Sequence, residues 1–359
     1  MPYKSGHNGS RFRISINAIL YLYMFKKNYF GLLLPLFAAV VTASGCSDNS
    51  ADRETDDVGA VRFGMTSVSR RGVTGDAELQ AKGSSFCVWG TFSKSGSAPV
   101  QVFESTKVTS DGNGEWSYDD TQYWFPSFTY DFRAIHPADF PQGVTISGTG
   151  RQLNVTGFDA ASDIDLLAAA SPSINCDNPG SMAPVNLEFR HLLTRVVFTG
   201  RSDEQFLGSG RRIVVDRAVL YGMHTRGNWN SEPFTDIRPG IWTAAGDRTT
   251  AENSRHSVRG IELATDGTDL FPDCPMFFIP QNLSGVTLEI TYHYNYSDSE
   301  QPLTFTSSVD LGSVSEKWES GKSYRYPFTI SDHIFFETPT VEAWKYASIY
   351  SPDFNVDLN

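Results

Sequence analysis

Hydrophobic and polar positions alternate with a period of two along most of the chain after residue 60. Successive side chains of a β-strand point to opposite faces, so this alternation predicts strands, and the Gly, Pro, Asn and Asp clusters between the runs predict turns. Strand-like runs that recur every ten to fifteen residues, with almost no helical periodicity, indicate an all-β chain of antiparallel sandwiches. We expect a short helix only near residue 165, within residues 158–171. The predicted strands lie at residues 61–65, 84–92, 99–105, 130–135, 185–189, 194–198, 212–221, 286–296, 302–311 and 323–330.

The chain before Cys46 has a different pattern. Two lysines precede an apolar run at residues 30–41, and small residues follow this run up to the cysteine. The run is shorter than the roughly twenty apolar residues that a transmembrane helix needs. Its order of charged, apolar and small residues is typical of a secretory signal peptide. The Ser-Gly-Cys ending resembles a bacterial lipobox, so we expect translation from Met24, acylation of Cys46 and removal of residues 1–45. An ordinary signal peptide with an incidental cysteine is the alternative.

A short acidic tether and two domains are predicted after the signal. Residues 47–60 carry acids, Ser and Asn with almost nothing apolar, so residues 46–60 are interpreted as the acylated cysteine and its solvated tether. About 310 remaining residues exceed what one hydrophobic core usually organises, so two domains are expected. The loop at residues 171–184 is rich in Pro and Gly, and we place the boundary after it, near His191. The predicted domains are an N-terminal sandwich, residues 61–190, and a C-terminal sandwich that ends in a strand or tail, residues 191–359.

Charge and cysteine content narrow the class of protein. The chain has 29 basic and 41 acidic residues, a net charge of −12, and without residues 1–45 it has 24 basic residues, a net charge of −17. Such a surface repels nucleic acid and anionic lipid. The remaining cysteines, Cys87, Cys176 and Cys274, are odd in number, so they cannot all pair within the chain. We interpret them as small buried hydrophobic residues, although export permits one disulfide.

Few motifs point to chemistry. The SGKS sequence at residues 320–323 lacks the first glycine of a phosphate loop, since Glu316 occupies that position. His293 alternates with tyrosines on a predicted strand, which favours a position on a sheet face over metal binding. The acidic stretches at residues 110–116 and 264–269 lack the glycine and distal glutamate of a calcium loop, so we interpret them as turns. The sequence therefore predicts no catalytic residue, no metal and no cofactor.

Four segments, taken in order, resemble the fimbrillin family, also called Mfa-like proteins or type V pilins. They are WSYDDTQYWFPSFTYDFRAIHP at 116–137, LEFRHLLTRVVF at 187–198, FFIPQNLSGVTLEITYHY at 277–294 and WESGKSYRYPFTI at 318–330. Trp344 stands where the family ends a strand with tryptophan. In the fourth segment we expect a hairpin turn at Gly321 and Lys322, followed by one buried strand face formed by Tyr324, Tyr326 and Phe328.

The resemblance implies two transthyretin-like β-sandwiches in tandem, export as a lipoprotein to the outer surface, and assembly with other fimbrial subunits. It also implies contact with outer-membrane lipid through Cys46 and with surface receptors on host or bacterial cells. Major subunits of the family are cut after an arginine, which releases the N-terminal strand and opens a groove for a donor strand. Here the cut would follow Arg70 or Arg71, although both could be solvated loop residues. The strand released would contain Val61, Phe63 and Met65.

The expected donor strand is the apolar C-terminal stretch at residues 343–359, where Phe354, Val356 and Leu358 alternate. The same residues could instead close the C-terminal domain of a single subunit. The leading functional hypothesis is a non-catalytic fimbrial subunit or accessory adhesin, lipid-anchored and surface-exposed. The alternative is a surface glycan-binding lipoprotein, in which exposed aromatic residues such as Trp229 and Trp242 stack on sugars.

Overall fold

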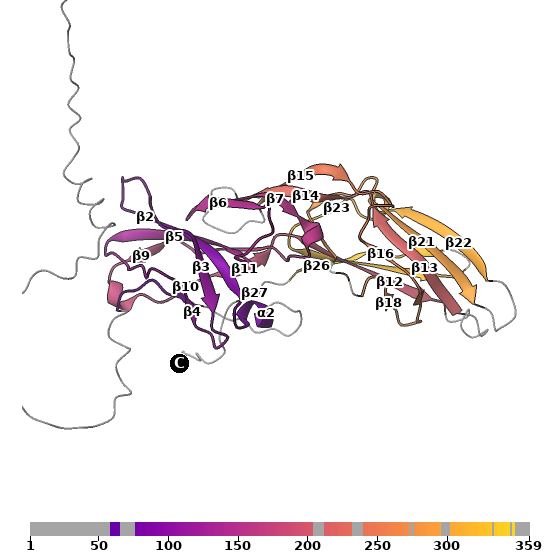
Figure 1. The fold of residues 1–359 in the computed structure, drawn as a ribbon, viewed down its shortest axis with the longest axis horizontal. Coiled ribbons are helices and arrows are strands. Elements are labelled where there is room, and N and C mark those ends of the chain that lie inside the picture. The colour runs from indigo at the N-terminus through magenta and orange to yellow at the C-terminus, as the bar shows by residue number, and fades with distance from the viewer. Residues whose placement is uncertain are drawn as a thin grey trace, which may run out of the picture. The chain divides into compact units, whose positions relative to one another are not determined.

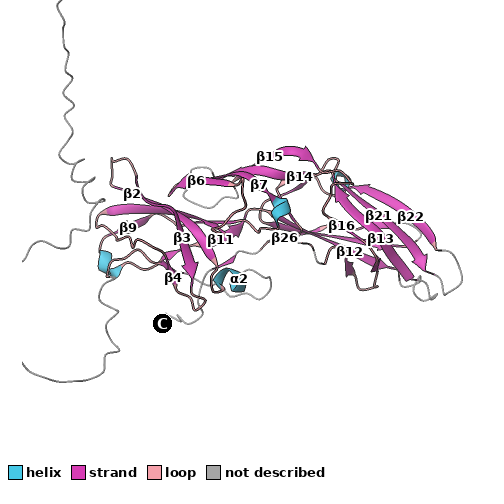
Figure 2. Cartoon of the chain, viewed as in Figure 1, coloured by secondary structure: helices cyan, strands magenta, loops and turns pink. Residues whose placement is uncertain are grey.

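The structure is a computed structural model that describes residues 58–64, 76–203, 212–231, 240–272, 274, 276–295, 302–331, 334–344 and 347–348. All of these belong to one compact unit, Thr55–Asn359. Strands dominate this unit, as Figure 1 and Figure 2 show, which confirms the all-β prediction. Its helical elements are single short turns: α2 (Asp76–Gln80), η1 (Ala160–Ser162), η2 (Pro179–Ser181) and η3 (Leu311–Ser313). Within the described ranges, no helix has the length and apolar character needed to span a membrane.

The period-two pattern located most of the long strands. The strand predicted at residues 212–221 is observed with the same bounds as β13 (Arg212–Tyr221). The strand predicted at 99–105 continues further along the chain, as β3 (Val100–Ser110). The single stretch predicted at 185–189 is divided into β10 (Val185–Asn186) and β11 (Glu188–His191). Alternation therefore fixes where strands lie better than where they end.

One sheet, formed by strands from the first part of the chain together with β27 from near its end, has eight strands among the described residues. Its order is β27-β11-β8-β5-β2-β3-β4, with β9 beside β5. All its pairs are antiparallel. Besides β3 and β11, the sheet contains β2 (Ser85–Ser93), β4 (Trp116–Ser117), β5 (Phe128–His136), β8 (Leu167–Ala170), β9 (Ile174–Cys176) and β27 (Ala347–Ser348).

A four-stranded antiparallel sheet has the order β15-β14-β7-β6. It joins strands from before and after residue 191, because β14 pairs with β7. The division into domains at residues 61–190 and 191–359 therefore stays a prediction. The four strands are β6 (Thr145–Thr149), β7 (Gln152–Asp159), β14 (His224–Asn230) and β15 (Ile241–Arg248).

Two further sheets contain most of the later strands. The six-stranded sheet has the order β18-β12-β24-β25, with β19 beside β12 and β26 beside β24, and the five-stranded sheet has the order β16-β13-β21-β22, with β17 beside β13. The β12–β24 pair is parallel, unlike its neighbours. The strands are β12 (Thr194–Ser202), β16 (Ser257–Val258), β17 (Ile261–Glu262), β18 (Thr268–Asp269), β19 (Phe277–Phe278), β21 (Thr287–Asn295), β22 (Leu303–Asp310), β24 (Lys322–Ile330), β25 (Ile334–Phe336) and β26 (Thr340–Ala343).

Strand β2 shows how the first half is packed. Phe86 and Val88 point into one hydrophobic cluster, while Cys87 and Trp89 point into another on the opposite face of the sheet. Both faces of β2 are therefore covered, and eight of its nine residues are buried. In the second half, Tyr324, Tyr326 and Phe328 of β24 are buried on one face, as predicted, and they pack against β13 and β21. Cys87 and Cys176 are buried free thiols and Cys274 is a half-buried one.

Two local predictions were wrong. The stretch at residues 158–171 forms only the single turn η1 and then strand β8, because the run of alanines after Leu167 pairs with β5. Gly321 does lie in a turn with a positive φ of 67°, but that turn does not close a hairpin. The strand before it, β23 (Lys317–Trp318), pairs instead with β20 (Gln281–Asn282), in a different sheet from β24.

Candidate functional site: the groove that holds the N-terminal segment

Residues 59–64, within the first described stretch of the chain at 58–64, are held between two other parts of the backbone, and we call them the N-terminal segment. On one side it runs antiparallel to residues 122–124. The amide of Val61 donates to the carbonyl of Gln122 at 2.8 Å, and the amide of Trp124 donates to the carbonyl of Gly59 at 2.8 Å. The backbone of this segment is therefore paired with residues 122–124 through an isolated antiparallel bridge, Ala60 opposite Tyr123.

Its other side is paired with a different part of the chain. The amide of Val185 donates to the carbonyl of Arg62 at 2.7 Å. Strand β1 (Phe63–Gly64) then runs parallel to β10, with Phe63 opposite Val185. A Cβ added at Gly64 would lie 2.5 Å from the Cβ of Pro184, so this close approach requires glycine. The segment is thus held between two unrelated stretches of backbone.

Aromatic rings surround Phe63. Its ring centroid lies 5.4 Å from that of Phe103, 5.8 Å from Tyr118, 5.9 Å from Phe132 and 6.1 Å from Phe86, all in edge-to-face arrangements. Aromatic pairs favour this geometry. Phe63 is 4% exposed, and Val61, two residues earlier, is 1% exposed. The alternating side chains of the N-terminal segment therefore fill prepared positions in the core of the eight-stranded sheet.

The groove also has polar groups that fix the segment without adding charge. The Tyr118 hydroxyl donates to the carbonyl of Val61 at 2.6 Å. The Tyr130 hydroxyl accepts the amide of Phe125 at 2.8 Å, and its ring lies 4.6 Å from that of Trp124. Burial raises the pKa of Tyr130 to about 12, so this phenol stays neutral at ordinary pH. The groove is suited to an apolar strand.

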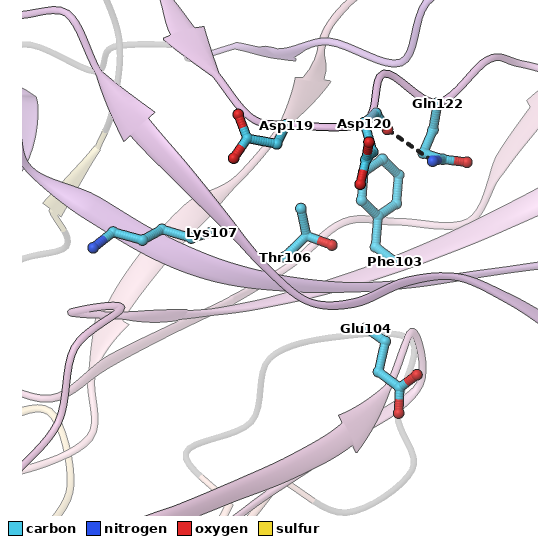
Figure 3. Close-up of a pocket in the computed structure, with 7 residues that line it drawn as sticks. All are labelled: Phe103, Glu104, Thr106, Lys107, Asp119, Asp120 and Gln122. Atoms are coloured by element: carbon cyan, nitrogen blue, oxygen red, sulfur yellow. Dashed lines mark hydrogen bonds between the residues drawn. The ribbon is translucent and has the colours of Figure 1, made fainter.

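A pocket of about 320 Å³ lies beside this groove. In Figure 3, Asp119, Asp120 and Gln122 lie above β3, and the Gln122 amide donates to the Asp120 carbonyl at 2.8 Å. Glu104 points away from the other six side chains. The pocket shares Phe103 and Gln122 with the groove, so it is part of the same region of the molecule.

The acidic loop at residues 110–116 forms a turn, as predicted. One carboxylate oxygen of Asp111 accepts the amides of Asn113 at 2.7 Å and Glu115 at 3.0 Å. These hydrogen bonds lower the pKa of Asp111, and the one from the Asn113 amide has the largest effect. The carboxylate is thus used by its own loop. Across the described part of the chain, no group of three or more His, Cys, Asp or Glu side chains could hold a metal ion.

Several predicted site residues lie outside the described ranges. Of the predicted released strand, Val61 and Phe63 are described and buried. The proposed lipidation site, the two arginines of the proposed cleavage site, the third residue of the released strand and the donor residues are not: Cys46, Arg70, Arg71, Met65, Phe354, Val356 and Leu358.

The start of the C-terminal stretch is described. Trp344 is buried, and its ring stacks on His191 at 3.7 Å between centroids with an interplanar angle of 7°. The imidazole Nδ1 of His191 lies 2.9 Å from a carboxylate oxygen of Asp165. Strand β27 then pairs antiparallel with β11, at the edge of the eight-stranded sheet. The chain therefore returns to the first half of the molecule shortly before its end.

The sugar-stacking residues are not placed as that alternative requires. Trp229 is 2% exposed and belongs to a hydrophobic cluster, so the expectation of an exposed ring is wrong. Trp242 is half-buried, and its indole N–H donates to the carbonyl of Leu192 at 2.8 Å. Trp229 and Trp242 are cross-strand partners and therefore share one face of this sheet, the buried one. The sequence pattern alone did not show which face is buried.

The groove has walls that the sequence did not identify. Tyr118 and Trp124 belong to the first segment that resembles the fimbrillin family, but nothing in their spacing places them against residues 59–64. The opposite wall, at residues 184–186, joins the end of the predicted loop at 171–184 to the start of the predicted strand at 185–189. Pairing between such distant segments has no local signal, so an alignment of related sequences would have been needed to find it.

No curated protein matches the sequence. The chain resembles a candidate cell adhesion protein from Bacteroides uniformis, with 17% identity, a TM-score of 0.47, and coverage of 82% of this chain and 100% of the other. A candidate cell adhesion protein from Bacteroides eggerthii has 12% identity, a TM-score of 0.44, and coverage of 79% and 95%. The fimbrial anchor protein Mfa2 from Porphyromonas gingivalis has 14% identity, a TM-score of 0.31, and coverage of 81% and 98%.

The family comparison is decisive because it covers most of the chain. The sequence profile of the fimbrillin-like family matches residues 73–344 of this chain. This range includes the four segments quoted above, the eight-stranded sheet up to β11, and the strands of the later sheets. The chain belongs to the fimbrillin-like family.

Proposed function

We propose that this chain, whose family gives it a structural role in fimbriae at the cell surface, is a lipid-anchored fimbrial subunit or accessory adhesin that assembles by strand exchange. In this proposal, cleavage at Arg70 or Arg71 releases the N-terminal segment. A C-terminal strand of another subunit, containing Phe354, Val356 and Leu358, then occupies the empty groove.

The observation that carries the proposal is the way the N-terminal segment is held. Its carbonyls and amides are paired on both sides, and Val61 and Phe63 are buried. Fully burying each such side chain contributes about 1.5–3 kcal/mol. Loss of the segment would leave an apolar groove and unpaired backbone groups, which an added strand can satisfy. An empty groove is therefore a strong acceptor for a strand of similar pattern.

The positions of the two ends of the exchange support it. In the sequence, Arg70 and Arg71 lie between Gly64 of β1 and Asp76 of α2, so a cut there would separate the segment from the rest of the chain. At the other end, β27 already pairs as a strand with the first-half sheet at Ala347–Ser348. The proposed donor residues follow β27 after only a few positions.

Treatment of the purified protein with an Arg-specific protease tests the proposal. Cleaved full-length protein should form polymers, which light scattering would detect as a large rise in mass. A double variant, R70Q/R71Q, should resist the cut and stay at its starting mass. A chain that ends at Pro352 should be cut but should not polymerise, because it lacks the donor residues.

Two results would contradict strand exchange. One is that cleaved full-length protein keeps its starting mass. The other is that the protease cuts wild-type protein at neither Arg70 nor Arg71. A third result, polymerisation of the chain that ends at Pro352, would show that the donor is a different segment.

Lipid anchoring rests on the signal sequence and has its own test. We expect Cys46→Ala to abolish labelling by a fatty-acid analogue and to release the protein from the membrane fraction. The matched control is Cys274→Ser, which removes a half-buried thiol of the folded unit and should leave labelling unchanged. Equal labelling of C46A and wild-type protein would contradict acylation at this residue.

A further inference from the structure

Strand β22 forms one edge of the five-stranded sheet. It pairs with β21 over all eight residues, Leu303–Asp310, without a register shift. Its other side has no strand partner within the described residues, since β22 ends the sheet order. Figure 1 shows β22 at the margin of this sheet, beyond β21. The outer side of β22 therefore presents a straight row of backbone donors and acceptors.

Two apolar side chains on the core-facing side of β22, Leu303 and Phe305, are left exposed, whereas Val309 further along is half-buried against the core. Phe305 lies opposite Tyr292, and Leu303 lies opposite Tyr294, and both tyrosines are buried. Yet Phe305 is 41% exposed and Leu303 is 59% exposed. The ring of Phe305 still stacks on Tyr292, with centroids 5.7 Å apart. The apolar face of the sheet thus continues onto an edge strand that lacks a neighbour.

This edge also lacks the features that usually block strand addition. Natural edges carry charges, bulges or proline, or they are very short. Residues 303–309 contain no charged residue and no proline, and the one charged residue of β22, the terminal Asp310, is used to accept the amides of Gly285 and Gly312. The edge strand β15 is of equal length but differs, because its pairing with β14 shifts register and it ends in Asp247 and Arg248. Among the long described edges, β22 is the least protected.

The sequence of β22 complements itself in antiparallel register. With Thr306 opposite Thr306 of a second copy, Thr304 lies opposite Ser308 on the solvent-facing side, and Leu303 lies opposite Val309 on the core-facing side. Hydroxyl pairs and apolar pairs across strands both stabilise a sheet. A shift by one residue would place apolar side chains opposite the hydroxyl face, so registers displaced by one residue are disfavoured. Thr306 already lies 3.0 Å from Thr291, hydroxyl to hydroxyl, on the same face.

We propose that β22 is a self-association surface, to which β22 of a second copy of this chain adds in antiparallel register with Thr306 at the centre. A second copy fits this edge because the strand complements itself in this register. Copies carry a net charge of −12 and repel over most of their surfaces, but residues 303–309 bring no charges together, so this edge adds no repulsion of its own. On the neighbouring strand, Glu289 is already paired with Arg217 at 2.8 Å. The proposal is independent of arginine cleavage and of the N-terminal groove.

A charge introduced at Thr306, the centre of the proposed pairing, tests the proposal. In sedimentation of the uncleaved protein, the average mass should rise toward twice the monomer mass as concentration increases. T306K and T306E should each lose this rise, because like charges would lie directly opposite one another. An equal mixture of T306K and T306E should recover it. T145K, which adds the same charge at an exposed position on β6, should behave as wild type.

Cross-linking tests the register. Paired residues in a sheet lie within the distance that a disulfide spans, whereas residues four positions apart lie about 13 Å apart along the strand. Under oxidation, T306C should form a covalent dimer, and T304C should give no more dimer than wild type. A wild-type protein that stays monomeric at all concentrations would overturn the proposal. So would a dimer that T306K leaves intact, or equal cross-linking of T304C and T306C.

Discussion

The N-terminal segment and β22 have the same alternating pattern but opposite surroundings. Phe63 is 4% exposed within four aromatic rings, whereas Phe305 is 41% exposed although it also lies on the core side of a sheet. The segment is paired on both sides, and β22 is paired on one. Alternation therefore tells which side chains face a core, but pairing of both edges decides whether the core is closed over them.

The difference also separates two kinds of strand addition. At the N-terminal groove, a segment of the same chain already occupies the position between β10 and residues 122–124, so exchange requires that segment to leave first. At β22, the position beyond the edge has no strand from the described residues, so a second copy can add without any release. We expect the first process to be switched by cleavage and the second to depend on concentration alone.

The largest expected effect comes from removing the aromatic side chain of the segment. Phe63→Ala should lower the free energy of unfolding by about 3–5 kcal/mol, because a large buried side chain leaves a cavity. Phe305→Ala should cost only roughly 1–2 kcal/mol, because much of that ring is already in water. Denaturant titration of both variants measures the difference. Equal losses would show that the two strands are buried to a similar extent in solution.

One acid-sensitive group lies in the half of the molecule that contains β22. His256 is buried against Phe278, with ring centroids 4.8 Å apart, and neither ring nitrogen has a hydrogen-bond partner among the described residues. Burial, reinforced by the charge of Arg255, lowers the pKa of His256 to about 4 from 6.5. Protonation of this ring therefore opposes folding.

The direction of the pH effect follows from this shift. Above pH 6.5 the ring is neutral in both states, and the full stability is present. As pH falls from about 6.5 to 4, His256 becomes protonated in the unfolded chain but stays neutral in the folded protein. We therefore expect the free energy of unfolding to fall by about 3 kcal/mol. His256→Leu should remove this part of the pH dependence. Identical slopes for the variant and the wild type in denaturant titrations at a series of pH values would contradict the assignment.

The strands were predictable because their signal is local. The runs that became β2, β13, β21, β22 and β24 are strand-like stretches bounded by turn residues, and each was located within a few residues. The failures occurred where the result depends on distant pairing. The alanines at residues 168–170 look helical alone, yet β5 and β11 on either side draw them into a sheet. Gly321 was recognised as a turn, but its flanking strands join different sheets.

The candidate site was predictable only in part. The apolar alternation of Val61 and Phe63 after an acidic stretch indicated a strand, and both residues are buried. Its partners at residues 122–124 and 184–186 are some 60 and 120 positions further along the chain, and no period or motif links them. The exposure of Trp229 was mispredicted for the same reason, because the hydrophobic cluster that buries its ring contains residues from both halves of the chain.

The smallest expected effect isolates the polar contribution to the groove. The Tyr118 hydroxyl donates to the carbonyl of Val61 at 2.6 Å and accepts the amide of Gln122 at 3.3 Å. Tyr118→Phe keeps the ring packed against Phe63 and removes both hydrogen bonds. We expect a loss of about 1 kcal/mol, since water can reach part of this half-buried site. Tyr123→Phe, in the same stretch but 43% exposed, should change stability by less than about 0.5 kcal/mol. Urea titration gives both values, and hydrogen exchange at the Val61 amide should quicken in Y118F alone. If the two variants lose the same stability and exchange alike, side-chain packing and backbone pairing hold the segment without help from Tyr118.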